Sequence, residues 1–187
     1  MRRARCRDAT IAVVVALLSA VSSSAQDVTE PSLKAAFLYN MAKFVEWPSD
    51  VLPDTASLTA CVVGDTPVGR ALERTVIGRT VSGRAVVVSR IAADASPRAC
   101  HLLYVSGLAP AQVQQMAAAS RGAPILTVID VETASHRPGG VAHMFVENGK
   151  LRFNVDQGLA KRSRLQISSK LLALAKRVYD DPAGGAP

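Results

Sequence analysis

The chain has 187 residues, of which 49% are hydrophobic, 20% are charged and 4% are aromatic. This composition is typical of one globular domain and excludes a disordered chain. The sequence has no Gly-X-Y period, no heptad tract and no apolar run of membrane-spanning length outside its N-terminus. It therefore excludes collagen, a coiled coil and a polytopic membrane protein.

Residues 1–25 have the pattern of a cleavable signal peptide. Arginines at positions 2, 3, 5 and 7 precede an apolar stretch from residue 11 to residue 21. Small side chains follow at Ser23 and Ala25, which fits cleavage after Ala25. The apolar stretch is too short to span about 30 Å of hydrocarbon comfortably, although an uncleaved anchor is the alternative. We therefore expect a periplasmic protein with one domain at residues 26–180 and a flexible, Pro/Gly-rich tail at residues 181–187.

Removing the signal segment changes the charge. The full chain has a net charge of +7, and residues 1–25 hold four arginines and one aspartate, so +4 remains. This balance is too mild to indicate nucleic acid as a partner. The densest basic run is Lys161, Arg162 and Arg164. It predicts either a solvated helix end or a patch for anionic headgroups or an acidic partner.

The cysteine count is even once the signal segment is removed. Cys6 leaves with that segment, and Cys61 and Cys100 remain. An even count in an oxidising compartment favours a disulfide, and neighbouring strands would bring the two residues together. Two buried free thiols are the alternative. No further His or Cys stands at ligand spacing beside either one, so a metal site is not expected.

Residues 31–44 predict an amphipathic helix, which Trp47 and Pro48 end. Its apolar stripe consists of Leu33, Phe37, Met41 and Phe44. Additional apolar residues make this face wider than one core contact requires. We expect Leu38, Val45 and Trp47 to meet a partner or a second copy of the chain. Burial against the sheet of the same domain is the alternative.

The next segments alternate between strands and helices. Strands are predicted at residues 58–63, 84–91, 101–105 and 124–129, and helices at residues 68–75 and 110–120, with a loop at residues 92–99. This alternation predicts a single three-layer α/β domain in which helices flank a mostly parallel sheet.

The pattern changes near the C-terminus. Two strands, at residues 141–146 and 151–155, flank Asn148-Gly149, which is a strong hairpin signal. A C-terminal amphipathic helix is then predicted from the apolar residues Ile167, Leu171, Leu174, Ala175 and Val178.

No catalytic or cofactor-binding pattern is evident. Residues 64–71 join a strand to a helix, but they lack the lysine and hydroxyl of a phosphate-binding loop and the third glycine of a dinucleotide fingerprint. The histidines His101, His136 and His143 have no metal-ligand spacing, and no GxSxG elbow is present. We expect neither an enzyme nor a cofactor. The alternative to a protein-binding role is a small-ligand sensor that uses the loops at residues 64–69, 106–110 and 130–140, because open parallel sheets bind ligands at such ends.

Several motifs, in order along the chain, resemble the YfiR family of exported proteins. They are residues 33–48 (LKAAFLYNMAKFVEWP), 61–65 (CVVGD), the Cys100-His101 pair, 124–128 (PILTV), Gly139-Gly140, 152–155 (RFNV) and 165–175 (LQISSKLLALA). Each motif is weak alone, and the ordered set is specific.

The resemblance implies a periplasmic α/β protein that represses a membrane-bound diguanylate cyclase by docking on its periplasmic sensory domain. It also implies an outer-membrane lipoprotein that draws the repressor away, and a homodimer. Cys61 and Cys100 fall at the position of the family's first cysteine pair. The second pair, near residues 135–141, is absent here, so redox switching through a second bridge is not implied for this chain.

Overall fold

The computed structural model describes residues 29–63 and 67–180. Its helices are α2 (Glu30–Ala42), α3 (Pro67–Val76), the 3-10 helix η1 (Pro97–Ala99), α4 (Pro110–Ser120), α5 (Gln157–Arg162) and α6 (Ser169–Leu174). Its strands are β1 (Val45–Glu46), β2 (Leu58–Val63), β3 (Thr80–Val81), β4 (Arg84–Ile91), β5 (Leu102–Val105), β6 (Leu126–Asp130), β7 (Ala142–Glu147), β8 (Lys150–Asp156), β9 (Gln166–Ile167) and β10 (Arg177–Tyr179). The predicted signal peptide and the predicted tail lie outside the described residues.

An eight-stranded sheet forms the centre of the domain, in the order β10-β8-β7-β6-β5-β2-β4-β3. All neighbours from β7 to β4 are parallel, whereas β8 is antiparallel to β7 and β3 is antiparallel to β4. Strand β5 is buried along its whole length, and β2 and β6 are buried at all but one residue each, as expected for a sheet with both faces covered. The mostly parallel sheet predicted from the sequence is confirmed.

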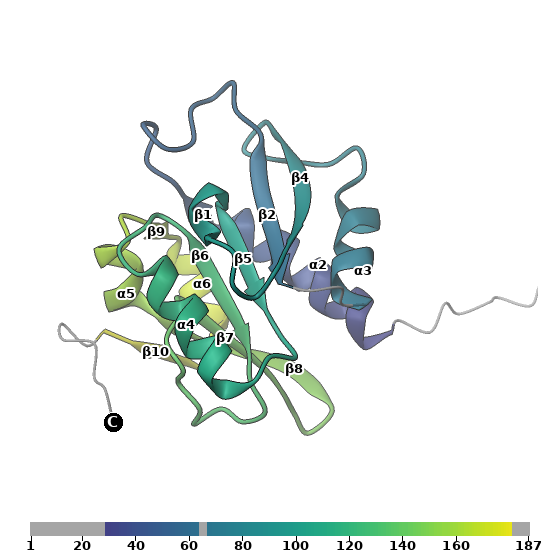
Figure 1. The fold of residues 1–187 in the computed structure, drawn as a ribbon, viewed down its shortest axis with the longest axis vertical. Helices are drawn as coiled ribbons and strands as arrows, with labels where there is room; N and C mark the ends of the chain where they lie inside the picture. Colours follow the sequence, from purple (N-terminus) through teal and green to yellow (C-terminus); the bar gives the residue numbers. More distant parts are fainter. Residues whose placement is uncertain (1–28, 64–66, 181–187) are drawn as a thin grey trace, which may run out of the picture.

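Helices cover both faces of the sheet, which makes the domain three-layered. The face that we call the α2 face packs against α2, α3, α5 and α6 and contains the larger core cluster. The opposite face, the α4 face, packs against α4 and the β6–β7 loop (residues 131–141). In Figure 1, α4 lies in front of the sheet and α2 lies behind it.

The hairpin prediction is also confirmed. Strands β7 and β8 pair antiparallel, with Glu147 opposite Lys150 beside the turn. The two turn residues, Asn148 and Gly149, have φ angles of 50° and 69°. Positive φ at both central positions defines a type I′ turn, and asparagine and glycine adopt it with the least strain.

The C-terminal segment differs from the continuous helix expected there. Helix α6 ends at Leu174, and Ala175 is extended with a ψ of 140°. The Lys176 amide then donates to the carbonyl of Phe153, and β10 continues along β8 as a parallel strand. Leu174 and Val178 are 67% and 42% exposed, so their helical spacing does not mark a buried face. Backbone pairing at the sheet edge has overridden the apolar periodicity.

Candidate partner-binding site

Trp47 lies at the amino-terminal ends of the central strands. Strand β1 leads into it and pairs antiparallel with β9, so that Glu46 stands opposite Gln166. The indole Nε1–H donates to the backbone carbonyl of His101, 3.1 Å away. The Nδ1 atom of His101 in turn accepts a hydrogen bond of 2.9 Å from the Thr59 amide. These bonds fix the half-buried indole between the short β1–β9 sheet and the large sheet.

An open groove of about 450 Å³ adjoins this indole, and we call it the Trp47 groove. Its lining residues are Glu46, Trp47, Pro48, Lys161, Arg164, Leu165 and Gln166. Arg164 has a φ of 59°, a left-handed conformation that is uncommon for arginine, and it turns the chain from α5 towards β9. The groove is therefore built where two segments more than a hundred residues apart in sequence meet.

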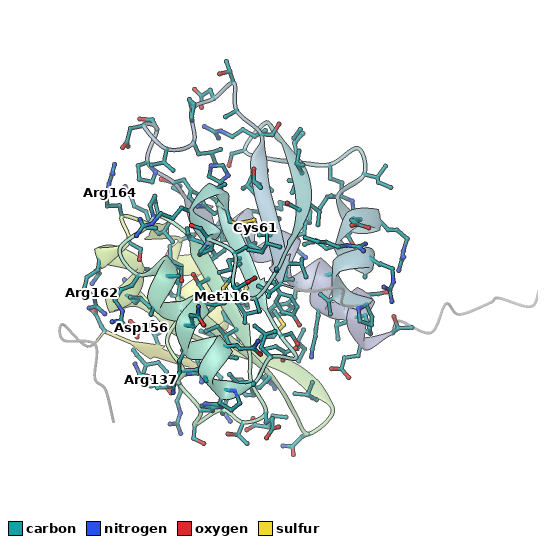
Figure 2. The ribbon with its side chains drawn as sticks, in the orientation of Figure 1. Cys61, Met116, Arg137, Asp156, Arg162 and Arg164 are labelled. Atoms are coloured by element: carbon teal, nitrogen blue, oxygen red, sulfur yellow. A yellow bond between two sulfur atoms is a disulfide. The ribbon has the colours of Figure 1, made fainter. Side chains whose placement is uncertain are left out.

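The rim of the Trp47 groove carries charges of both signs, because Lys161 and Arg164 line it together with Glu46. Lys161 and Arg162 occupy the last turn of α5, where cations complement the partial negative charge of a helix C-terminus. Figure 2 shows Arg162 and Arg164 on the same side of the molecule. Lys161 pairs with Asp180 at 3.0 Å, and Arg164 pairs with Asp50 at 2.5 Å. Exposed pairs of this kind contribute little stability, so acidic groups of a partner can replace them at low cost.

Trp47 is more exposed than the other two residues expected at a partner surface. Leu38 is 0% exposed and Val45 is 2% exposed, and both belong to the core on the α2 face. At these two positions the domain itself covers the apolar face, which was the alternative interpretation, whereas Leu33 of the same stripe is 41% exposed. Of the three residues, Trp47 is the one with a side chain at the surface of the monomer.

The predicted bridge joins Cys61 of β2 to Cys100, which directly follows η1. Their Cα atoms are 5.7 Å apart, and the two residues are 2% and 4% exposed. Both lie in the core of the α4 face. The bridge joins the strand β2 to the start of β5, its neighbour in the sheet. The disulfide prediction is confirmed, and the buried free thiols of the alternative are not present.

The opposite, carboxyl-terminal edge of the sheet holds a polar cluster that sequence reasoning missed. Asp130 ends β6, and its Oδ2 atom is 2.5 Å from Lys34 Nζ of α2. The same atom accepts a hydrogen bond of 2.7 Å from Tyr104, and Ser106 Oγ is 3.4 Å away. Lys34 also pairs with Glu30 at 2.8 Å. Three side chains of the protein itself therefore surround the Asp130 carboxylate at this edge of the sheet.

Burial shapes the ionisation of this cluster. Desolvation lowers the pKa of Lys34, but its hydrogen bonds and charge interactions with Asp130 and Glu30 outweigh this effect, so the net pKa is raised. Burial, together with the charge of Asp130, also raises the pKa of Tyr104. Lys34 therefore stays charged and Tyr104 stays protonated, which is the combination that stabilises the Asp130 carboxylate. An aspartate at the end of a strand and a lysine on a mostly apolar helix were the signals available in the sequence.

A second buried polar group lies on the α4 face. The Nε2 atom of His143 donates to the Gly139 carbonyl at 3.1 Å, and the amide of Asn154 donates to the Ala134 carbonyl at 2.9 Å. Nδ1 of His143 and Oδ1 of Asn154 are the buried side-chain atoms that lack a partner within residues 29–63 and 67–180. Burial lowers the pKa of His143 to about 4.

These bonds attach the β6–β7 loop to the sheet. Arg137 of that loop pairs with Asp156 at 3.1 Å and stacks over the ring of Tyr179 at 3.8 Å. His136 of the same loop is exposed whereas His143 is buried, so the two histidines do not share a surface. Among the described residues no group of three potential metal ligands occurs.

Comparison with known proteins gives a family. A family model described as YfiR/HmsC-like (DUF4154) matches residues 31–176. A search of curated proteins gave no match. In the part of the chain that the structure describes, no helix has the length and apolar character required to cross a bilayer.

Proposed function

Because the chain belongs to the YfiR/HmsC-like family, whose members are periplasmic regulators in cyclic-di-GMP signalling, we propose that it binds and represses an inner-membrane diguanylate cyclase. The periplasmic sensory domain of the cyclase is the proposed docking partner. The family is regulatory rather than catalytic, in agreement with a chain in which no catalytic constellation was expected.

The Trp47 groove is the observation that supports docking at a defined place. An indole held at one end by a hydrogen bond, with its ring beside an open groove, is typical of the anchors that dominate protein interfaces. Lys161 and Arg164 of the groove lining can exchange their exposed partners Asp180 and Asp50 for acidic groups of another protein, which would add electrostatic selectivity. We propose that the cyclase presents an apolar side chain to the groove and acidic groups to the rim.

Cellular cyclic-di-GMP measures repression directly. Deletion of the gene is expected to raise cyclic-di-GMP, and the wild-type chain is expected to restore the low level. Arg164→Glu reverses an exposed rim charge and is expected to fold but not to repress. Arg121→Glu is the matched control, because Arg121 is exposed at the C-terminal end of α4, away from the groove.

Binding and repression need separate measurement. The periplasmic domain of the cyclase is expected to co-purify with the wild-type chain and with Arg121→Glu, and to be lost from Arg164→Glu. A Trp47→Glu variant is informative if its circular dichroism and melting temperature match those of the wild type. Unchanged cyclic-di-GMP after deletion, together with no cyclase among the co-purifying membrane proteins, would contradict the proposal.

Two further partners follow from the same proposal. An outer-membrane lipoprotein is proposed to compete with the cyclase for the regulator, and a homodimer is the proposed solution state. Light scattering on the purified chain measures whether it is a dimer. A competition experiment with the purified lipoprotein and the cyclase domain measures whether the two compete for the regulator. A regulator that binds the cyclase and the lipoprotein simultaneously would contradict the competition.

A further inference from the structure

Strand β4 is the long strand at one end of the sheet, and most of its outer edge is unpaired. On its inner side it pairs with β2 from Val86 to Ile91. On its outer side the two-residue strand β3 pairs only with Arg84 and Ala85. Within the described residues, the outer edge of β4 from Val86 onwards has no strand partner. An edge of this kind presents backbone donors and acceptors to any extended chain that lies beside it.

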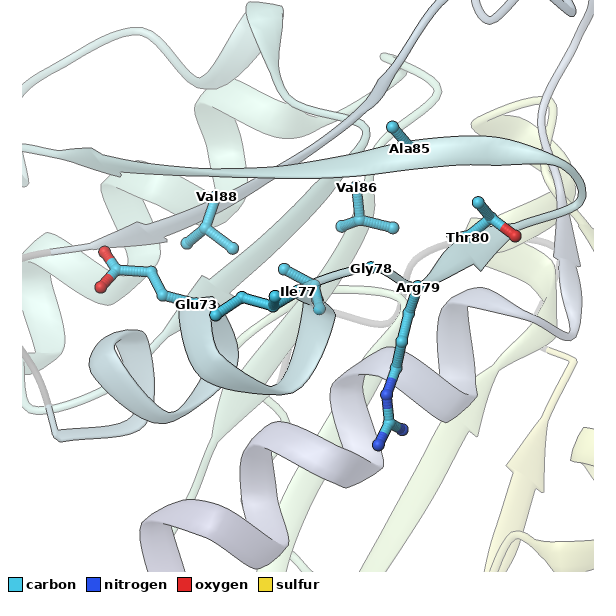
Figure 3. A pocket seen from close by; sticks show the side chains of 9 residues that line it. Glu73, Ile77, Gly78, Arg79, Thr80, Ala85, Val86 and Val88 are labelled. Atoms are coloured by element: carbon cyan, nitrogen blue, oxygen red, sulfur yellow. The ribbon is translucent and has the colours of Figure 1, made fainter.

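A groove lies beside this edge, between β4 and α3, and we call it the β4 groove. It has a volume of about 590 Å³ and is lined on its apolar side by Val76, Ile77, Val86 and Val88. Figure 3 shows Val86 and Val88 projecting from β4 towards α3, with Ile77 on the α3 side of the groove. Ile77 is 76% exposed, which is unusual for so apolar a side chain.

The edge and the groove together match the geometry of strand addition. In a strand paired with β4, alternate side chains would point towards α3 and enter the groove beside Val86 and Val88. The intervening side chains would point to the opposite side, where Val87 of β4 is 50% exposed. Backbone hydrogen bonds would supply affinity, and the groove would select apolar side chains at alternate positions.

The charge around this edge specifies the partner further. Residues 67–91 contain five arginines and one glutamate, a net charge of +4. Arg74 and Arg79 are exposed on the α3 side of the groove, whereas Arg90 pairs with Glu73 of the groove lining and Arg84 pairs with Asp54. A second copy of this chain would bring the same net charge of +4 against itself. Repulsion between like charges makes a second copy a poorer occupant than an acidic segment.

We propose that the β4 edge binds an extended, acidic segment of another protein by strand addition, with apolar side chains at every second position entering the β4 groove. This surface is distinct from the Trp47 groove, and its use does not depend on the proposed function. It gives the protein a second, sequence-selective interaction surface.

The test uses the purified chain beginning at Gln26 and two synthetic peptides. The first is Glu-Val-Glu-Ile-Glu-Val-Glu, and the second has lysine in place of each glutamate. Titration with the fluorescently labelled peptides is expected to show at least tenfold tighter binding of the acidic peptide. Amide hydrogen exchange is expected to slow at alternate residues between 86 and 91 when that peptide is bound, because the amides that face away from β2 become paired.

Two substitutions at exposed isoleucine and leucine side chains provide the matched comparison. Ile77→Glu is expected to weaken binding of the acidic peptide at least tenfold, because it places a negative charge in the groove. Leu174→Glu, at a side chain that is 67% exposed on α6, is expected to leave binding unchanged. Melting temperatures of both variants are measured first, to establish that each is folded.

Three outcomes would overturn the proposal. Equal affinity for the acidic and basic peptides would remove the charge selectivity. Unchanged exchange at residues 86–91 at millimolar peptide would remove strand addition. A chain that is dimeric by light scattering and becomes monomeric in Ile77→Glu would show that a second copy occupies the edge instead.

Discussion

The two faces of the sheet are stabilised by different means. On the α2 face, Lys34 and Tyr104 both contact the carboxylate of Asp130, so a charge near the core is neutralised and hydrogen-bonded. On the α4 face, a covalent bridge joins Cys61 to Cys100. The unpaired acceptors of His143 and Asn154 also lie beside the loop on this second face.

This difference follows from what covers each face. Helices cover the α2 face. One of them, α2, places Lys34 next to Asp130 at the end of β6. The α4 face is covered over β7 and β8 by the β6–β7 loop, whose carbonyls bond His143 and Asn154. Elsewhere on this face, the Cys61–Cys100 bridge links β2 covalently to the start of β5. The predictions that follow separate these contributions.

Removal of the Asp130 carboxylate should have the largest effect. The Lys34 side chain is only 11% exposed. Asp130→Ala therefore leaves a largely buried ammonium group without its closest counter-charge. Removing one partner of a buried ion pair costs about 3 to 5 kcal/mol in free energy of unfolding. Urea denaturation at pH 7 measures the loss. Asp180→Ala, which breaks the exposed pair with Lys161, is the control and should leave the midpoint nearly unchanged. If both variants lost the same free energy of unfolding, the Lys34–Asp130 pair would contribute no more than the exposed Lys161–Asp180 pair.

Loss of the disulfide should lower the free energy of unfolding by nearly as much, and the effect should be confined to the α4 face. The bridge closes a loop with a sequence separation of 39 residues, and the chain-entropy model gives about 4 kcal/mol as an upper value for such a loop. Cys61→Ser combined with Cys100→Ser should lower the urea midpoint, as should reduction of the wild type. Hydrogen exchange should accelerate first around Met116 of α4, which lies in the same core. If α2 exchanges as fast as α4 in the variant, the two faces do not differ in the way described.

Acid should weaken the α4 face through His143. Burial lowers the pKa of His143 to about 4, whereas an unfolded histidine has a pKa of about 6.5. Between these values the unfolded chain binds a proton that the folded chain does not bind. The contribution of His143 is therefore complete above about pH 6.5 and is lost as the pH falls towards 4, by up to about 3 kcal/mol.

A pair of histidine variants identifies the group responsible for this acid sensitivity. His143→Gln should flatten the pH dependence of the unfolding free energy between pH 6.5 and 4. His136→Gln, at an exposed histidine of the same loop, should retain it. A pH dependence that persists unchanged in His143→Gln would show that His143 is not the group responsible.

The sequence predicts the central strands and the hairpin, but it does not predict most of the buried polar contacts. The strand at residues 58–63 and the Asn148-Gly149 hairpin were predictable, because continuous apolar runs and turn residues are local signals. The Asp130 cluster was not, since Lys34 and Asp130 are 96 residues apart and meet only after folding. The segment from Ala175 onwards was assigned to a helix because its spacing was helical, but the free edge of β8 competes for its backbone. Leu38 and Trp47 have similar apolar character in sequence, and only the fold separates core from surface.

The smallest predicted effect tests whether the Asp130 cluster acts as a unit. Tyr104→Phe removes a hydroxyl that donates to Asp130 and should cost about 1.5 kcal/mol, because hydrogen bonds to charged groups are stronger than neutral ones. Tyr39→Phe is the control, since the Tyr39 hydroxyl donates to the Thr80 carbonyl at an exposed site and its loss should be smaller. In the Asp130→Ala background, Tyr104→Phe should cost less than it does alone, because the hydroxyl has already lost its acceptor. Strictly additive losses in this double-mutant cycle, measured by urea denaturation, would mean that Tyr104 and Asp130 stabilise the α2 face independently.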